Sequence, residues 1–238
     1  PYYRAWAEVF PANAAIRWMA TEGREGTAPE HLSRALRTSG FYVLRSGWDA
    51  DATVMVLKAG PQGFWHCQPD NGTFELWHRG RNFFPDSGSY VYAGDKEVTD
   101  QRNWFRQTRV HNTVTLDDRD LEKTDSKLLL WDATPELTML VTENPSYEGL
   151  THRRAMFFTG EGLLVIADQV SGPAAGNVGV HFNLCPGRIE YARDGTVRTL
   201  FADGNNIRIK TSATVPVQIR EEEGWVSTAY RKKEERPA

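Results

Sequence analysis

From Gly40 onward, this chain is a series of short strand-like runs separated by turn residues. Residues 53–57 and 163–167 are rich in β-branched and other apolar side chains, and Asp194-Gly195 is one of several turn signals between such runs. Similar runs occur at residues 41–44, 114–116, 128–131, 137–141, 154–158, 178–184, 188–192, 197–201, 207–211 and 215–219. Short, regularly spaced strands are typical of antiparallel sandwiches. The sequence therefore predicts a mainly β fold, an antiparallel β-sandwich of multi-stranded sheets, over residues 40–238.

The first 39 residues have a different pattern. Within residues 2–22, aromatic and apolar side chains recur at helical spacing, and Pro11 breaks the run. We expect two short helices and a linker here, as the end of a separate helical domain covering residues 1–39. One further helix is expected inside the β region, at residues 99–107, with Thr99 or Asp100 as its N-cap.

Composition limits the partners of the chain. The 238 residues carry a formal net charge of −3, so the overall charge does not attract a polyanion such as nucleic acid. No apolar run approaches the ~20 residues that a membrane helix needs, and Cys67 and Cys185 do not make a disulfide framework. We therefore expect no nucleic-acid partner and no membrane partner. An acidic ligand would need a local basic patch, for which the candidates are Arg79, Arg81, Arg102, Arg106 and Arg109.

The run from Trp65 to Gly88 concentrates the candidate site residues. It begins with His66, passes a turn at Asp70-Asn71-Gly72 and reaches Asp86 near its end. We interpret the segment after the turn as one outgoing strand, which places His66 and Asp86 at the two ends of a hairpin-like unit. His111 follows where another strand begins. Polar, titratable residues grouped at strand ends and turns are where sites are usually built.

Segments spread over nearly the whole chain carry a family resemblance. They are PANAAIRWMATEGREG, SRALRTSGFYVLRSGWD, WHCQPDNGTFELWHRGRNFFPDSGSYVY, RVHNTVTLD and EGWVSTAYRKKEERPA. In these segments the chain resembles the heparinase II/III family of polysaccharide lyases, and most closely its heparinase III branch. The resemblance implies an N-terminal (α/α) helical toroid joined to C-terminal antiparallel β sheets. On this basis we expect a C-terminal fragment: the end of the toroid and a β-sandwich truncated at its C-terminus.

The resemblance also implies roles for four residues. His66 takes the place of a catalytic histidine. Asp86 and His111 match two metal-binding residues, and Gln68 stands where many relatives have a metal-binding histidine. Nitrogen and carboxylate ligands suit Zn²⁺, whereas a side-chain amide oxygen suits a harder ion such as Ca²⁺. A divalent metal is therefore expected, and its identity stays open between these two.

Asn71, Arg81 and Asn82 are our candidates for substrate binding, with support of the turn as the alternative role. Arginine suits sulfate and carboxylate groups because its planar fork donates two parallel hydrogen bonds. We assign no site role to His152, and we interpret the charged run at residues 231–236 as a solvated strand end.

The implied chemistry is β-elimination at a uronic acid of heparan sulfate or heparin. A base removes the C5 proton and an acid protonates the leaving O4, and a histidine can serve in either role near neutral pH. The toroid, against which this chain would pack, is expected to supply further catalytic groups, so the isolated fragment should be weakly active or inactive. Two alternatives remain: a non-catalytic carbohydrate-binding β-sandwich, and a lyase for another uronate polymer such as alginate. Family habit implies a periplasmic or secreted protein.

Overall fold

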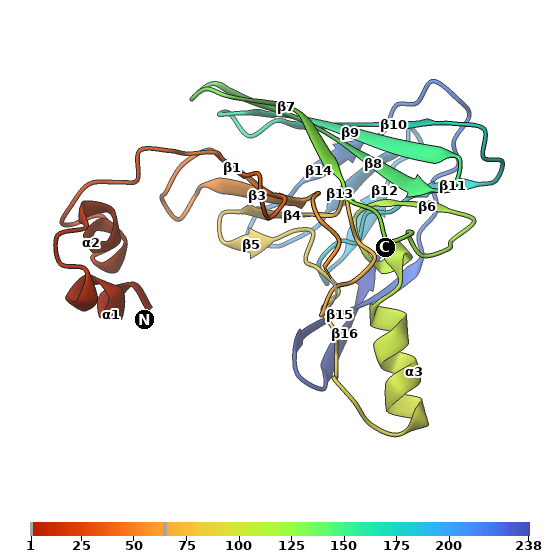
Figure 1. The fold of residues 1–238 in the computed structure, drawn as a ribbon, viewed down its shortest axis with the longest axis horizontal. Helices are drawn as coiled ribbons and strands as arrows, with labels where there is room; N and C mark the ends of the chain where they lie inside the picture. Colours follow the sequence, from red (N-terminus) through yellow and green to blue (C-terminus); the bar gives the residue numbers. More distant parts are fainter. Residues whose placement is uncertain (1, 64–65) are drawn as a thin grey trace.

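The computed structural model describes residues 2–63 and 66–238, so Trp65 lies outside the described residues. The chain opens with two short helices, α1 (Tyr2–Val9) and α2 (Ala14–Ala20), which stand apart from the β body (Figure 1). The break between them contains Pro11, as predicted. No helix in the described part of the chain is both long and apolar enough to cross a bilayer.

The remainder of the described chain is mainly β, in several antiparallel sheets, which confirms the predicted fold class. A five-stranded sheet has the order β1 (Arg34–Leu36), β2 (Phe41–Arg45), β3 (Thr53–Lys58), β4 (Phe74–His78) and β5 (Arg81–Asn82). A four-stranded sheet has the order β10 (Leu164–Ser171), β9 (Leu150–Thr159), β8 (Leu137–Tyr147) and β7 (Lys127–Ala133). The five-stranded sheet thus begins before residue 40, and the division of the chain into two domains stays a prediction.

Three smaller sheets and two further helices complete the described elements. The smaller sheets are β6 (Val114–Leu116) with β11 (Val178–Val180), β12 (Ile189–Tyr191) with β13 (Thr196–Thr199) and β14 (Arg208–Lys210), and β15 (Glu223–Ala229) with β16 (Lys232–Pro237). The helices are α3 (Lys96–Phe105) and the single-turn 3₁₀ helix η1 (Thr108–Val110). Figure 1 shows α3 and the β15–β16 hairpin projecting together from one side of the β body.

The main hydrophobic core lies between the two large sheets. Met55 and Leu57 of β3 alternate with half-buried neighbours, as expected for a strand with one face on the core. They belong to the same buried cluster as Leu140 of β8 and Met156 of β9. Burial of one such side chain contributes about 1.5–3 kcal/mol, so this interdigitated layer holds the sheets face to face.

A buried guanidinium of the four-stranded sheet holds two of the loops that carry the motif residues. Arg154 of β9 is 1% exposed, and its Nη1 donates to the carbonyl oxygens of Gly72 and Asn112, each at 2.6 Å. Its Nε and Nη2 donate to the two carboxylate oxygens of Asp168 at 2.7 and 3.0 Å. The Nε2 atom of His152 lies 2.7 Å from Asp168 as well. His152, to which the sequence assigned no role, is therefore part of this buried network.

Two sequence predictions of local structure are wrong in informative ways. Residues 73–84 do not form one strand, because Arg79 and Gly80 adopt φ values of 48° and 72° and turn β4 back onto β5. Two successive residues with positive φ are typical of a tight hairpin turn. Between His66 and Asp86 the chain therefore passes through the β4–β5 hairpin and not through a single strand. Residues 215–219 form no strand, and the Val215 side chain is 65% exposed.

The helix predicted at residues 99–107 exists but begins earlier. It starts at Lys96, and its N-cap is Asp95, whose Oδ1 accepts from the backbone N–H of Val98 at 3.0 Å. The predicted caps, Thr99 and Asp100, therefore lie inside the helix. Asp95 and Asp100 are the same residue type and equally good N-caps, so residue preference alone does not separate the two starts, and the prediction missed Asp95.

Loss of the Arg154 guanidinium should destabilise the protein strongly. Arg154→Leu leaves Asp168 buried without its cation, which typically costs about 3–5 kcal/mol. Arg153→Leu is the matched control, because Arg153 is the next residue of β9 and its pair with Glu143 is partly solvated, so its loss should cost less than about 1 kcal/mol. Urea unfolding of both variants measures the difference, and equal costs would contradict the account.

The same network predicts acid sensitivity. Burial alone would raise the pKa of Asp168, but Arg154 and the bond from His152 outweigh it and hold that pKa well below its ordinary value. A depressed pKa in the folded state gives stability that is present above the unfolded value of about 4 and is lost as pH falls below it. Asp168→Asn should therefore flatten the fall of unfolding free energy between about pH 4 and pH 2. An unchanged slope in that range would argue against it.

Candidate active site and metal-binding cluster

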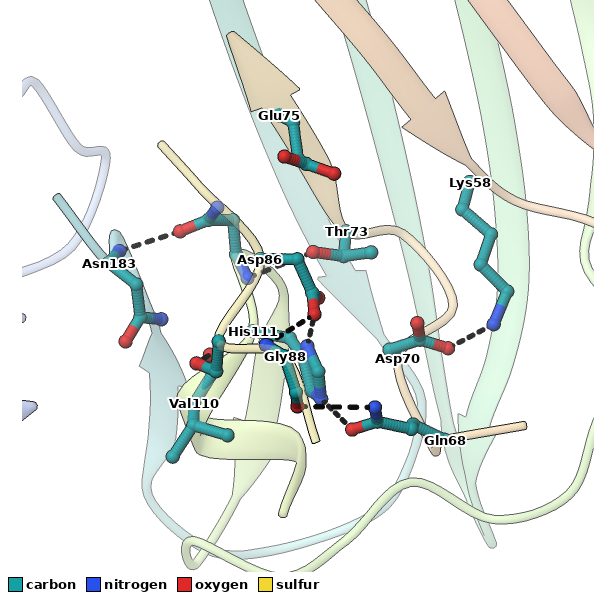
Figure 2. Close-up of polar contacts among 12 residues, drawn as sticks. Lys58, Gln68, Asp70, Thr73, Glu75, Asp86, Gly88, Val110, His111 and Asn183 are labelled. Carbon is teal, nitrogen blue, oxygen red and sulfur yellow. Dashed lines mark hydrogen bonds and ion pairs between the residues drawn. The ribbon is translucent and has the colours of Figure 1, made fainter. Parts of the chain in front are cut away.

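Three loops bring a histidine, two carboxylates and an amide together at one end of the five-stranded sheet, where β3 finishes and β4 begins (Figure 2). His111 lies directly after η1, with its ring 1% exposed. Its Nδ1 is 2.8 Å from Oδ2 of Asp86, and its Nε2 is 2.9 Å from Oε1 of Gln68. Gln68 Nε2 points to the carbonyl oxygen of Gly88 at 3.5 Å, which fixes the amide oxygen toward the ring. The three residues predicted as metal ligands are thus in direct contact.

The imidazole of His111 lies between oxygens of Asp86 and Gln68, and a ring protonated on both nitrogens would donate to each of them. Complete burial disfavours this charge, but the carboxylates of Asp86 and Asp70 outweigh burial and raise the pKa of His111. In return, His111 is the main favourable influence that lowers the pKa of Asp86 against its burial. With His111 protonated, the cluster contains an ion pair between a buried imidazolium and the partly exposed carboxylate of Asp86.

A fourth donor, Asp70, completes a group able to hold a metal ion. One ligand atom each from Asp70, Asp86 and His111 lie within 4.8 Å of one another, and Gln68 Oε1 contacts the same imidazole. A divalent cation could take the place of the proton on His111. It could also take the place of the Lys58 ammonium group as the positive partner of Asp70. The sequence marked Asp70 only as a turn residue, although its position two residues after Gln68 on the same loop was a usable signal.

His66 lies at the exposed end of the loop that carries Gln68. Its φ is +56°, a left-handed conformation that costs a non-glycine residue about 1–3 kcal/mol. Its ring meets the edge of the Tyr92 ring, with the centroids 5.6 Å apart and an interplanar angle of 70°. A strained backbone that presents an exposed histidine is a common feature of functional sites. His66 is therefore available to a ligand in a way that buried His111 is not.

The three predicted substrate-binding residues are engaged inside the protein. Asn71 is 2% exposed and bonds the backbone of Gly60 and the carbonyl oxygen of Thr124. Arg81 forms a bidentate ion pair with Asp203, in which Nη1 and Nη2 donate to the two carboxylate oxygens at 3.2 and 2.8 Å. Asn82 donates to Glu75 at 2.7 Å and accepts from the backbone N–H of Phe84 at 3.2 Å. These bonds tie strand ends together and weigh against direct contact with sugar.

Arg236, for which the sequence predicts exposure to solvent, is buried and holds the loops that carry Asp86 and His111. Residues 231–235 are exposed, as the interpretation of a solvated strand end predicts, but Arg236 of β16 is 4% exposed and corrects that interpretation at this one residue. Its Nη1 donates to the carbonyl oxygen of Pro85 at 2.6 Å, and its Nη2 bonds Ser87 and the carbonyl oxygen of Val110. Burial lowers the pKa of Arg236 to about 10, so it stays charged at neutral pH. It fastens the residues that flank Asp86 and the residue before His111 to the C-terminal hairpin.

The structure is a mainly β scaffold of antiparallel sheets that carries an exposed histidine beside a group of possible metal ligands, and comparison with known proteins shows the family. The family model described as "Heparinase II/III-like, C-terminal" matches residues 28–238. The chain belongs to this family, as the sequence motifs predicted.

Curated relatives and solved structures agree with this assignment. The chain is 50% identical over 235 residues to a heparin-sulfate lyase of Bacteroides stercoris and 46% identical over 238 residues to one of Pedobacter heparinus, with 98% and 99% of this chain covered. It covers 35% and 36% of those two proteins, about a third of their length. A solved heparinase III structure matches 99% of this chain and 37% of its own with a TM-score of 0.96 and 52% identity. The heparan sulfate lyase structure from Pedobacter heparinus matches the same shares with a TM-score of 0.95 and 45% identity.

Divalent metal should stabilise the protein through the cluster. An ion that binds only the folded state at 100 times its Kd adds about 2.7 kcal/mol, so the thermal midpoint should rise with Zn²⁺ or Ca²⁺, and less so at acid pH, because the ion must displace a proton from His111. Asp86→Ala should lose the response, whereas Asp51→Ala, which removes an exposed carboxylate, should keep it. A midpoint insensitive to both ions, or an equal response in the Asp86 variant, would contradict the site.

Proposed function

We propose that the complete protein cleaves heparan sulfate or heparin by β-elimination and that His66 acts directly on the uronic acid. The observation that carries this proposal is the exposed, strained His66 beside the Gln68–Asp86–His111 cluster, in a chain that shares 46–50% identity with two heparin-sulfate lyases. The share of those relatives that the chain covers is about a third, so the opposing wall of the site would come from residues outside it.

The elimination needs one proton removed and one delivered. A base takes the C5 proton of the uronate, the electron pair forms the C4–C5 double bond, and the C4–O4 bond breaks as O4 takes a proton. A histidine with its ring exposed can perform either transfer near neutral pH. The C5 proton becomes acidic only when the charge of the adjacent carboxylate is neutralised, so hydrogen-bond donors must face that carboxylate. The product is an unsaturated uronate at the new chain end.

The proposed metal has a structural role. Gln68, Asp70, Asp86 and His111 would hold it, and the three loops that supply them would be fixed with respect to one another. One nitrogen and three oxygens leave Zn²⁺ and Ca²⁺ as the candidates. Because Gln68 is two residues from His66 on one loop, fixing the cluster also fixes the base of the loop that presents His66.

Replacement of His66 should remove the activity without unfolding the protein. In the complete protein, His66→Ala should lower kcat on heparan sulfate by at least about 10²–10⁴-fold, the usual contribution of a general acid or base. The ultraviolet absorbance of the unsaturated product follows the reaction directly. His31→Ala, which truncates another exposed histidine, is the matched control and should leave kcat unchanged.

The outcomes of this experiment separate the alternatives. Full activity of the His66 variant would refute the role of His66. Activity of the unaltered protein on alginate and not on heparan sulfate would change the substrate and keep the chemistry. No product from heparan sulfate, heparin or alginate would leave a carbohydrate-binding protein, for which glycan binding is then the assay.

A further inference from the structure

Tyr92 lies beside His66, and Arg102 lies beside Tyr92. Neither residue belongs to the metal-binding cluster. Tyr92 is 61% exposed, yet its position is defined by contacts on two sides. Its ring edge meets the His66 ring, and the guanidinium carbon of Arg102 lies 5.2 Å from the centroid of the same ring. Arg102 comes from α3 and also donates to the carbonyl oxygen of Val91, next to Tyr92. The helix therefore holds Tyr92 against His66.

The segment that carries Tyr92 is fastened firmly. Val91 is 1% exposed, and the carbonyl oxygen of Tyr90 accepts from the backbone N–H of Arg231 in the β15–β16 turn at 2.9 Å. The Tyr90 ring stacks on Phe105 of α3 with the centroids 5.6 Å apart and the planes at 20°. The exposed Tyr92 therefore follows directly after two residues that α3 and the β15–β16 turn hold in place.

The charge next to Tyr92 is not neutralised within the protein. Among the described residues, Arg102 forms no ion pair with a carboxylate, although it is half-buried. Lys233 of β16 likewise forms no ion pair among the described residues. Its Nζ lies 5.7 Å from the centroid of the Tyr90 ring and 4.3 Å from that of the Trp225 ring. Arg81, by contrast, is fully engaged by Asp203. Arg102 on α3 and Lys233 on the hairpin are therefore two cations in this region that form no ion pair among the described residues.

We propose that Tyr92 and Arg102 form a subsite for an acidic sugar adjacent to the sugar on which His66 acts. A sulfate or carboxylate group would bind the Arg102 guanidinium, whose free N–H groups suit such anions. The exposed part of the Tyr92 ring would contact the apolar face of the sugar. This inference rests on the proposed function and extends it, because it assigns recognition of the acidic polymer to residues other than Asn71, Arg81 and Asn82.

The test separates binding from chemistry. In the complete protein carrying His66→Ala, calorimetric titration with a heparan sulfate tetrasaccharide gives a Kd that does not depend on turnover. Arg102→Gln in this background should weaken binding by about 10–100-fold, the value of one or two charge-assisted hydrogen bonds, with a smaller dependence on salt. Tyr92→Ala should weaken binding by about 3–10-fold. Arg198→Gln removes an exposed arginine of β13 and should leave the Kd within twofold or so of its starting value.

Arg102→Lys is the control for a folding defect in Arg102→Gln. It keeps the charge over Tyr92 and loses the planar fork, so binding should weaken less than in Arg102→Gln while the melting temperature is retained. With His66 intact, Arg102→Gln should raise KM for heparan sulfate by about the same factor as the Kd and leave kcat within about threefold. A Kd equal to that of the Arg198 control would overturn the subsite even if the protein is a lyase. A weakened Kd in a protein that forms no unsaturated product would keep the subsite and refute the lyase.

Discussion

The buried Arg154 guanidinium is the contact on which the geometry of the site depends. Arg154 lies in the four-stranded sheet, where it pairs with Asp168, and it also donates to the carbonyl oxygens of Gly72 and Asn112. Gly72 ends the turn that carries Asp70, and Asn112 directly follows His111. One side chain therefore sets the distance between two of the loops that supply ligands. Hydrophobic burial holds the sheets together but has no directional preference, whereas a guanidinium with four bonds at 2.6–3.0 Å fixes the loops in position.

A second arginine performs the same task on the remaining loop. Arg236 fastens Pro85 and Ser87, on either side of Asp86, and Val110, directly before His111. The Asp86–His111 pair is thus positioned by two buried arginines that bond backbone oxygens near it and do not bond the carboxylate of Asp86. Both arginines come from strands distant in sequence from the residues that they position. The geometry of the cluster consequently depends on contacts between strands that are distant in sequence, and His66 is its exposed neighbour.

The sequence predicted what depends on local pattern and missed what depends on long-range contact. The antiparallel strands and the contact of Gln68, Asp86 and His111 follow from alternation and from motif. The turn at Arg79-Gly80 was missed because an arginine rarely adopts a positive φ. Arg154 and Arg236 were missed because a charged residue in a strand pattern is ordinarily exposed, and only the tertiary structure supplies their carbonyl partners. The ion pair between Arg81 and Asp203 could not be predicted for the same reason, because Asp203 is far away in the sequence.

The central claim is that His66 faces the uronic acid at a site built on the Gln68–Asp86–His111 cluster. A crystal structure of the complete protein with His66→Ala, bound to a heparan sulfate tetrasaccharide, tests it most directly. The account predicts a uronate whose C5 faces the vacated position of the imidazole, with a neighbouring acidic group at Arg102. A tetrasaccharide bound on another face of the β body, with no sugar near residue 66, would contradict it.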